Sequence, residues 1–415
     1  MNLNIYARIT FLFVIFLGIH GCGGGGGGSS TSTTTASKEK IYLSADDGVN
    51  GFELYVSDGT SGGTTLVKDI NPSGSSNPIK LIEMNGYVYF CADSGTRTPS
   101  LWKTDGTTEG TVVVYSVSCG GSTNAVVIGD TFYFVGETTA TGVELWKSDG
   151  TMEGTVLVKD INPGTGDSLA WGIVEMGGNL YFGASDNGNN FELWKSDGTA
   201  DGTYLLKDIN PGITNSSYPR EWLVMGDMLY FVAFHDSYGY ELWKTDGTTE
   251  GTNILKDINT NRFGCDNSPL GSNPEMLTRI GDKFYFTAND NPNNSCTLIF
   301  NGPQVWVSDG ITTSKLIELA PPSTGGGSYP GNLTAVGDTL FFTGYTSTTG
   351  TEVWKSNGAV ENTVMVKDLN PGAASGYGYD GYATLFSAVN DSLYFSGTDG
   401  TNGIELWKSD GSDIN

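Results

Sequence analysis

The stretch ELWKSDGTMEGTVLVKDINPG at 144–164 returns almost unchanged at 192–212 as ELWKSDGTADGTYLLKDINPG. Shorter versions of it recur along the chain, and its central turn dipeptide occurs eight times. The first residues of these dipeptides, 44 to 63 positions apart, are Asp58, Asp105, Asp149, Asp197, Asp246, Asp309, Asn357 and Asp410. A repeat of this length is typical of β arrays in which each repeat forms one small sheet.

The third repeat shows four strand-like segments without insertions, at 124–130, 132–136, 144–148 and 155–161. They are short, rich in β-branched and aromatic residues, and separated by residues that favour turns. No helical period of useful length appears. The sequence therefore predicts an all-β protein, a β-propeller of about eight four-stranded antiparallel blades that covers 40–415.

The two ends of the repeat region leave one alternative open. The first repeat begins at the second strand, Ile41–Ala45, and the last ends at Asn415, where its fourth strand should start. This predicts six complete blades and two three-stranded ones. Seven blades plus an extra hairpin is the alternative.

Two residue types recur in every repeat and receive structural interpretations. The turn aspartates are expected to shape tight Asp-Gly hairpins rather than to bind metal. An aromatic column is expected to form the core between blades, because neighbouring strand residues face opposite sides of a sheet. Its members are Tyr55, Trp102, Trp146, Trp194, Trp243, Trp306, Trp354 and Trp407.

ELWKSDGT followed by LVKDINPG resembles the bacterial ELWxxDGT repeat family. The resemblance covers nearly all of 40–411 and weakens at Val305–Val307 and at Asn357. It implies a propeller-like, lipoprotein-anchored surface or exported protein. The family supplies no catalytic residues.

The N-terminal segment predicts the subcellular localisation of the protein. Arg8 precedes an apolar core of about eleven residues, Ile9–Ile19, which is too short to span a bilayer. The tetrapeptide Ile-His-Gly-Cys at 19–22 resembles a bacterial lipoprotein cleavage box, which implies a signal peptide at 1–21 and lipid on Cys22. Residues 22–39 then form a Gly/Ser/Thr tether. Gly23 follows the cysteine, so the lipoprotein sorting rule favours the outer membrane, at its cell surface or periplasmic face. An ordinary secreted protein is the alternative.

The four remaining cysteines suggest an oxidising compartment. Cys91 and Cys119 flank one blade, and Cys265 and Cys296 flank another in the same sense. Because the second-to-third strand loop and the link to the next blade emerge on one face, we expect two disulfides, Cys91–Cys119 and Cys265–Cys296. Free thiols are the alternative.

Composition excludes several functions. The formal charge of −25 argues against nucleic acid. After loss of the signal peptide, His235 would be the only histidine, so zinc clusters and a catalytic triad are disfavoured. We place His235 in a loop. No catalytic and no metal-binding residues are assigned, and the sequence favours a non-enzymatic protein.

Departures from the repeat pattern are more informative about function than shared residues, which build the blade. They gather at the links between blades and at the starts of the first strands, on one face. An aromatic and acidic surface of this kind suits sugars or peptides. The alternative is that these rings only fill the central channel. The candidate ligand-binding residues are Trp171, Tyr218, Arg220, Trp222, Tyr329, Tyr377, Tyr379, Asp380 and Tyr382.

Calcium is an alternative structural ligand, and otherwise no cofactor is expected. Acids recur in the loops between second and third strands, although no EF-hand-like loop is complete. These acids are Asp46, Asp47 and Glu53, Asp186 and Glu192, Asp236 and Glu241, and Asp399 and Glu405.

Three function hypotheses follow. The first is an exported envelope lipoprotein that binds a glycan or an envelope protein without chemistry, like an adhesin or lectin. The second is an envelope assembly or interaction scaffold, which resembles the propeller lipoprotein of the barrel-assembly machinery only in overall plan. The third is a carboxylate-based polysaccharide hydrolase or lyase, for which the 46 acids mark no particular catalytic pair.

Overall fold

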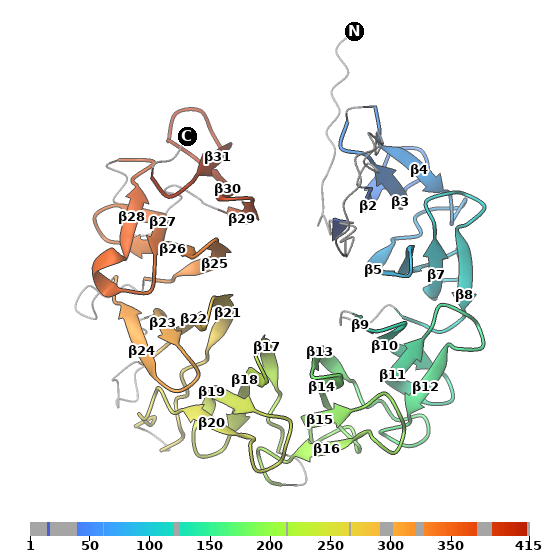
Figure 1. Ribbon diagram of the computed structural model, residues 1–415, viewed down its shortest axis with the longest axis horizontal. Helices are drawn as coiled ribbons and strands as arrows, with labels where there is room; N and C mark the ends of the chain where they lie inside the picture. The colour runs from blue at the N-terminus through green and yellow to red at the C-terminus, as the bar shows by residue number, and fades with distance from the viewer. Residues whose placement is uncertain are drawn as a thin grey trace, which may run out of the picture. The chain divides into compact units, whose positions relative to one another are not determined.

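The computed structural model describes residues 15–16 and 40–412, except 61, 120–124, 213–214, 265–266, 291–301, 320–327 and 372–383. The described residues form seven four-stranded sheets and one three-stranded sheet, all antiparallel (Figure 1). Within the described residues, a 3-10 turn, η2 (Val360–Asn362), precedes the last strand of sheet 7. None of the described helices is long and apolar enough to cross a membrane. This succession of small sheets is that of a β-propeller, as the repeat predicts.

The chain divides into two compact units, and the sheets are numbered 1 to 8 in chain order. Unit 1 comprises Met1–Leu180, Ala184–Gly188 and Ser196–Thr203, and unit 2 comprises the other residues. Sheet 1 contains β1 (Ile15–Phe16), β2 (Ile41–Asp46), β3 (Phe52–Ser57) and β4 (Thr65–Lys68). Sheet 2 contains β5 (Ile79–Met84), β6 (Tyr87–Ala92), β7 (Ser100–Thr104) and β8 (Val112–Tyr115). Sheet 3 contains β9 (Val126–Ile128), β10 (Thr131–Thr138), β11 (Gly142–Ser148) and β12 (Val156–Lys159).

The boundary between the units runs through sheet 4, and sheets 5 to 8 belong to unit 2. Sheet 4 contains β13 (Trp171–Met176), β14 (Asn179–Ala184), β15 (Glu192–Ser196) and β16 (Tyr204–Lys207). Sheet 5 contains β17 (Arg220–Met225), β18 (Met228–His235), β19 (Gly239–Thr245) and β20 (Asn253–Lys256). Sheet 6 contains β21 (Glu275–Ile280), β22 (Lys283–Ala288), β23 (Gln304–Ser308) and β24 (Thr313–Ile317). Sheet 7 contains β25 (Gly331–Val336), β26 (Thr339–Thr346), β27 (Gly350–Ser356) and β28 (Val364–Lys367), and sheet 8 contains β29 (Thr384–Val389), β30 (Ser392–Gly397) and β31 (Glu405–Ser409).

Of the two terminal sheets, the last agrees with the prediction and the first does not. Sheet 8 has three strands, as expected from the missing fourth segment. Sheet 1, predicted to have three strands, has four, because Ile15 and Phe16 pair with Tyr42 and Ile41 along the inner edge of β2. A two-residue strand is enough to pair part of that edge, and it comes from the segment predicted to be a signal peptide.

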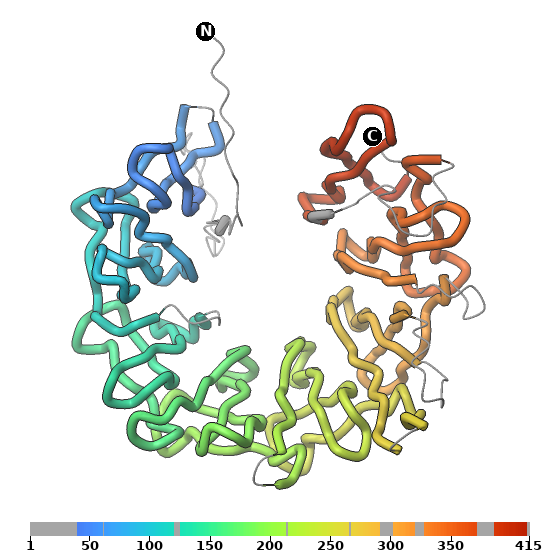
Figure 2. Tube along the Cα trace, turned by 180° about the vertical axis from the view of Figure 1, so that it is seen from behind, coloured from blue at the N-terminus to red at the C-terminus, as the bar shows by residue number. Residues whose placement is uncertain are grey.

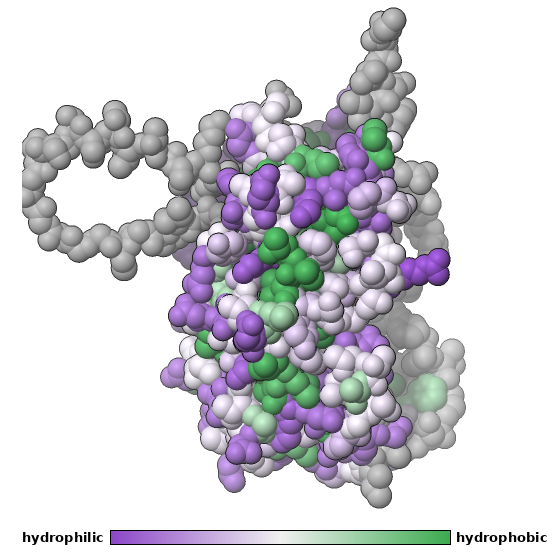
Figure 3. Space-filling model, turned by 90° about the vertical axis from the view of Figure 1, so that its right-hand side faces the viewer, coloured by the Kyte–Doolittle hydropathy of each residue, from purple (hydrophilic) through white to green (hydrophobic). Residues whose placement is uncertain are grey.

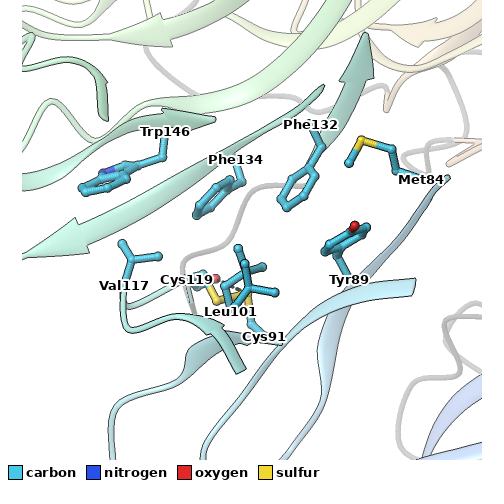
Figure 4. Packing of buried hydrophobic residues seen from close by; sticks show 10 residues of the cluster. Met84, Tyr89, Cys91, Leu101, Val117, Cys119, Phe132, Phe134 and Trp146 are labelled. Atoms are coloured by element: carbon cyan, nitrogen blue, oxygen red, sulfur yellow. Dashed lines mark hydrogen bonds between the residues drawn. A yellow bond between two sulfur atoms is a disulfide. The ribbon is translucent and has the colours of Figure 1, made fainter. Parts of the chain in front are cut away.

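The core lies between consecutive sheets, where the leucine and tryptophan of each Glu-Leu-Trp segment face opposite sides. Leu101 of sheet 2 and Trp146 of sheet 3 belong to one buried cluster with Tyr89, Phe132 and Phe134 (Figure 4). The same arrangement joins sheets 1 and 2, 5 and 6, 6 and 7, and 7 and 8. The Cα trace in Figure 2 shows the repeated up-and-down path of the chain within each unit. The aromatic column is therefore core, as predicted.

The turns after the third strands confirm the structural interpretation of their aspartates. In sheet 3, Asp149 Oδ1 accepts the Thr151 N–H at 2.9 Å and its hydroxyl at 2.7 Å. These hydrogen bonds lower the Asp149 carboxyl pKa. Gly150 has φ +88, and a Cβ there would collide with the Tyr89 hydroxyl of sheet 2.

Lysines of the preceding sheet contact five of these turns. Lys103 Nζ donates to the Gly150 carbonyl at 3.0 Å, and Lys147 Nζ donates to the Gly198 carbonyl at 2.9 Å. Lys195, Lys244 and Lys355 repeat the contact in unit 2. The Asp-Gly turn is encoded locally in the sequence, and in the structure it also accepts a hydrogen bond from the preceding sheet.

One of the two predicted disulfides is confirmed. Cys91, in β6, bonds to Cys119, which follows β8 of the same sheet, and their Cα atoms lie 5.8 Å apart. Cys265, Cys296 and Cys22 lie outside the described residues, so the second disulfide and the lipid anchor stay predictions.

Candidate functional site

The candidate ligand-binding residues lie where the sequence predicts, at or just before the first strands of their sheets. Trp171 begins β13, Arg220 begins β17, and Trp222 is the third residue of β17. Tyr218 and Tyr329 each come two residues before their strand. Trp171 belongs to unit 1, whereas the other four belong to unit 2. Tyr377, Tyr379, Asp380 and Tyr382 lie outside the described residues.

These strand starts contain left-handed backbone that the sequence did not reveal. Tyr218 has φ 45, Leu169 has φ 48 and Tyr329 has φ 38. Asn77 and Asn273 fill the same position in sheets 2 and 6. Asparagine tolerates this region, but tyrosine and leucine do so only at a cost of about 1–3 kcal/mol. The left-handed conformation recurs at this position in five sheets and therefore belongs to the repeat. Tyr218 and Tyr329 differ from the other residues there by a large exposed aromatic side chain, so they are the stronger candidates.

A second left-handed residue follows three positions later and opens a β-bulge. In sheet 5, Glu221 has φ 57, and the ladder between β17 and β18 shifts between Arg220 and Leu223. Glu221 Oε2 accepts the Met276 N–H of sheet 6 at 2.8 Å. The bulge therefore aims the Glu221 carboxylate at the next sheet.

Tyr218 and Arg220 form part of an aromatic and cationic surface. Tyr218 is 45 % exposed, and its ring stacks on Phe191 with a centroid distance of 5.7 Å. The Arg220 guanidinium lies 4.2 Å from the Tyr240 ring centroid. We call Phe191, Tyr218, Arg220 and Tyr240 the Tyr218 surface. The exposed Tyr218 ring can stack on a flat ligand, and the Arg220 guanidinium can donate hydrogen bonds to a ligand.

The structure separates Trp222 and Tyr329 from this surface. Trp222 is half-buried and stacks on the fully buried Phe231 at 5.5 Å, so its main contact is with the core. Tyr329 is 60 % exposed and precedes β25 of sheet 7. Tyr218 and Arg220 are therefore the two predicted residues that contact further aromatic rings at the start of sheet 5, and Phe191 and Tyr240 are ring partners that the sequence did not identify.

The glutamates of the Glu-Leu-Trp segments have a role that sequence reasoning missed. Glu241 is completely buried, and its carboxyl accepts the N–H groups of Ile258 at 3.1 Å, Asn259 at 3.2 Å and Ser272 at 2.8 Å. The Ser272 hydroxyl donates to it at 2.5 Å. Each such glutamate thus ties its third strand to the link that leads to the next sheet.

The equivalent glutamates are Glu53, Glu144, Glu192 and Glu352, all buried. Burial raises the carboxyl pKa of Glu144, Glu192 and Glu241 to about 7, although the hydrogen bonds oppose the shift. In sheet 6 the neutral Gln304 takes the position and accepts the Ser328 hydroxyl at 3.0 Å. The site therefore accommodates a neutral side chain.

The acidic loops use their carboxylates for local hydrogen bonds. Asp47 Oδ1 accepts the N–H groups of Val49 and Asn50, both at 2.9 Å, and Asp399 Oδ1 accepts those of Thr401 and Asn402. The described ranges contain no group of three or more acidic, histidine or cysteine residues arranged to hold a metal. Calcium stays a hypothesis that would rest on the loop aspartates, because Glu53, Glu192 and Glu241 accept internal donors.

His235 lies at the end of β18 rather than in the predicted loop. Its ring is half-buried, 4.9 Å from the Tyr238 ring and 6.2 Å from the Trp243 ring between centroids. Its Nδ1 accepts the Ser237 N–H at 2.9 Å. These contacts extend the strand by packing the imidazole against its own hairpin.

No protein-family model and no curated protein matches the chain. Solved structures resemble it at low identity. The computationally designed Ika8 protein is 14 % identical with a TM-score of 0.46, over 89 % of this chain and 93 % of that one. A chain from a study of two prolyl endopeptidases is 12 % identical with a TM-score of 0.45, over 81 % of this chain and 49 % of that one. The β-propeller domain of the Trilobed protease from Pyrococcus furiosus is 8 % identical with a TM-score of 0.39, over 81 % of this chain and 96 % of that one. These likenesses concern the fold and do not extend to activity.

Proposed function

We propose that this chain is an exported envelope lipoprotein whose β-propeller binds a glycan or an envelope protein without catalysing a reaction, like an adhesin or lectin. The observation that supports this most is Tyr218, a large ring held at φ 45, stacked on Phe191 and still 45 % exposed. Arg220 adds hydrogen-bond donors beside it. A sugar ring stacked on Tyr218 would keep its hydroxyls within reach of the guanidinium.

The proposed outer-membrane localisation follows from the first 39 residues. A signal peptide at 1–21, lipid on Cys22 and a glycine-rich tether would hold the propeller at the outer membrane. Labelling cells with radioactive palmitate, with a Cys22→Ala variant as control, tests this part separately. Label that persists in the variant would rule out the anchor.

The ligand proposal is tested by glycan-array binding of the purified protein, with and without calcium. The informative variant is Tyr218→Ala, and Tyr204→Ala is its matched control, because Tyr204 is 44 % exposed on the outer strand β16. We expect Tyr218→Ala to weaken glycan binding about tenfold and Tyr204→Ala to leave it unchanged. Equal weakening by both variants would contradict the proposed site. Glycan binding that is unchanged in Tyr218→Ala would also contradict it. Binding that requires calcium would favour the loop aspartates as its ligands.

An envelope interaction scaffold is the second candidate, and exposed edge strands favour it. In unit 1, β8 exposes Val112 by 40 % and Val113 by 50 %, and β12 exposes Val156 by 38 %. Figure 3 shows apolar patches on the side where Figure 1 places these strands. Unpaired apolar edges can accept a strand from another protein. Crosslinked partners lost in a Val113→Glu variant but retained in Tyr218→Ala would favour this function over glycan binding.

A further inference from the structure

Sheet 2 departs from the other sheets where its third strand begins. The register of β7 and β8 places Ser100 where sheet 3 has the buried Glu144, and Tyr115 where sheet 3 has Lys159. The Cys91–Cys119 disulfide takes over the connection to the link after β8.

A polar hollow of about 490 Å³ opens beside this disulfide, within unit 1. Arg97 and Thr98 reach it from the loop between β6 and β7, and Ser116 and Ser118 come from the link after β8. Glu137, at the end of β10, faces it from sheet 3. Its volume falls in the usual range for small-molecule sites.

The backbone of the hollow is firmly positioned on both sides. Arg97 has φ 68, and its N–H donates to Asp93 Oδ1 at 3.0 Å. The Gly95 N–H donates to the same oxygen at 2.9 Å. Across the hollow, Glu137 and Ser118 exchange both backbone hydrogen bonds, at 2.8 and 3.2 Å. A strained residue held by its loop is typical of a functional position.

The two charged side chains in the hollow are left without partners. In the part of the chain that the structure describes, neither the Arg97 guanidinium nor the Glu137 carboxylate makes an ion pair or a side-chain hydrogen bond. They line one hollow, yet they do not pair with each other. Opposite charges held apart by a polar space leave room for a ligand that carries both complementary charges.

We propose that this hollow binds a zwitterion, a free amino acid or short peptide, with its carboxylate on Arg97 and its ammonium group on Glu137. The guanidinium can pair with a carboxylate through two parallel hydrogen bonds. The hydroxyls of Thr98, Ser116 and Ser118 supply donors and acceptors for the peptide group between the charges. A simple anion would be repelled by the Glu137 carboxylate and by the net charge of −25. A simple cation would leave the Arg97 guanidinium without an anionic partner.

Isothermal titration of the purified full chain with three dipeptide probes tests the proposal. The probes are alanyl-alanine, its N-acetyl form, which lacks the ammonium group, and its C-terminal amide, which lacks the carboxylate. We expect alanyl-alanine to bind about tenfold more tightly than either blocked form, since each blocked form loses one charged pair. Equal binding of all three probes, or binding of none, would overturn the proposal.

Two variants assign the ends of the ligand. Arg97→Ala should abolish the preference for the free carboxylate only, and Glu137→Gln should abolish the preference for the free ammonium group only. Both side chains are exposed, so neither change should disturb folding. Glu153→Gln, in the exposed turn after β11, is the matched control and should bind like the unmodified chain. Either preference surviving in its variant would refute the assignment.

Discussion

Replacing Glu241 with glutamine removes one buried ionisable group and should change how stability depends on pH. The carboxyl of Glu241 is completely buried and receives three N–H groups and the Ser272 hydroxyl. Burial, with a smaller contribution from the nearby Asp257 carboxylate, raises its pKa to about 7. Gln304 already occupies the same position in sheet 6, so glutamine fits the space.

The magnitude follows from proton linkage. A carboxyl with a folded-state pKa of about 7 and an unfolded value near 4.5 binds a proton more tightly in the folded protein. Its contribution is fully present below about pH 4.5 and is lost as pH rises through about 7. Between about pH 5 and about pH 8, Glu241 should therefore remove about 2.5 kcal/mol from the free energy of unfolding. In the Glu241→Gln variant this position cannot ionise, so it does not lower the free energy of unfolding as pH rises.

Urea unfolding followed by tryptophan fluorescence measures the effect across that pH range. The amide turns a donor toward backbone N–H groups, so the variant should be less stable at about pH 5 by about 1–3 kcal/mol. This deficit should shrink by about 2.5 kcal/mol at about pH 8. Glu250→Gln is the control, because Glu250 lies exposed in the turn of the same sheet and should leave the pH profile unchanged.

The reasoning fails if the stability difference between Glu241→Gln and the unmodified protein is the same at every pH. That result would mean that the N–H donors keep the Glu241 carboxylate ionised despite its burial. A stability deficit of the Glu241→Gln variant that grows as pH rises from about 5 to about 8 would contradict the sign directly.

Three further predictions concern contacts that the repeat builds within unit 1, and urea unfolding measures each of them. Lys147→Met should lower the free energy of unfolding by about 1 kcal/mol, because it removes the hydrogen bond to the Gly198 carbonyl. Gly150→Ala should cost more than about 1 kcal/mol, since φ is +88 and the Tyr89 hydroxyl occupies the space; Gly74→Ala, whose Cβ would meet Asn71 Nδ2 at an ordinary contact distance of 3.8 Å, should be nearly neutral. Reducing Cys91–Cys119, which closes a separation of 28 residues, should cost about 3 kcal/mol, and a reductant should have a smaller effect on Cys119→Ala, in which only the predicted Cys265–Cys296 bond is left to reduce.

Strands, turns and core followed from the sequence because each is encoded locally. The third repeat predicts strands at 132–136 and 144–148, and the structure has β10 and β11 there. The opposite orientations of Leu145 and Trp146 follow from strand geometry alone. The Cys91–Cys119 bond was predictable because both residues end up on one face of a four-stranded sheet.

The buried glutamates show why part of the site escaped prediction. Glu53, Glu192 and Glu241 stand beside acidic loops in the sequence, which suggested calcium, whereas their hydrogen-bond donors lie 17 to 31 residues downstream. A signal was available: a serine follows each Asp-Ile-Asn segment in these repeats, at Ser76, Ser217 and Ser272. Recognising it requires knowing that the link folds back over the third strand.

By itself, the sequence determined the class of fold, the strands, the tight turns and the aromatic core, because hydrophobic alternation and Asp-Gly chemistry act over a few residues. Only the tertiary structure decided which polar groups form hydrogen bonds that hold the sheets together and which remain available to a ligand. Glu241 and Lys147 look like surface charges in the sequence, yet both serve internal contacts. Arg97, Glu137 and Tyr218 keep exposed side chains on backbone that other residues hold in place. That distinction depends on distances between residues far apart in the chain, which no local pattern encodes.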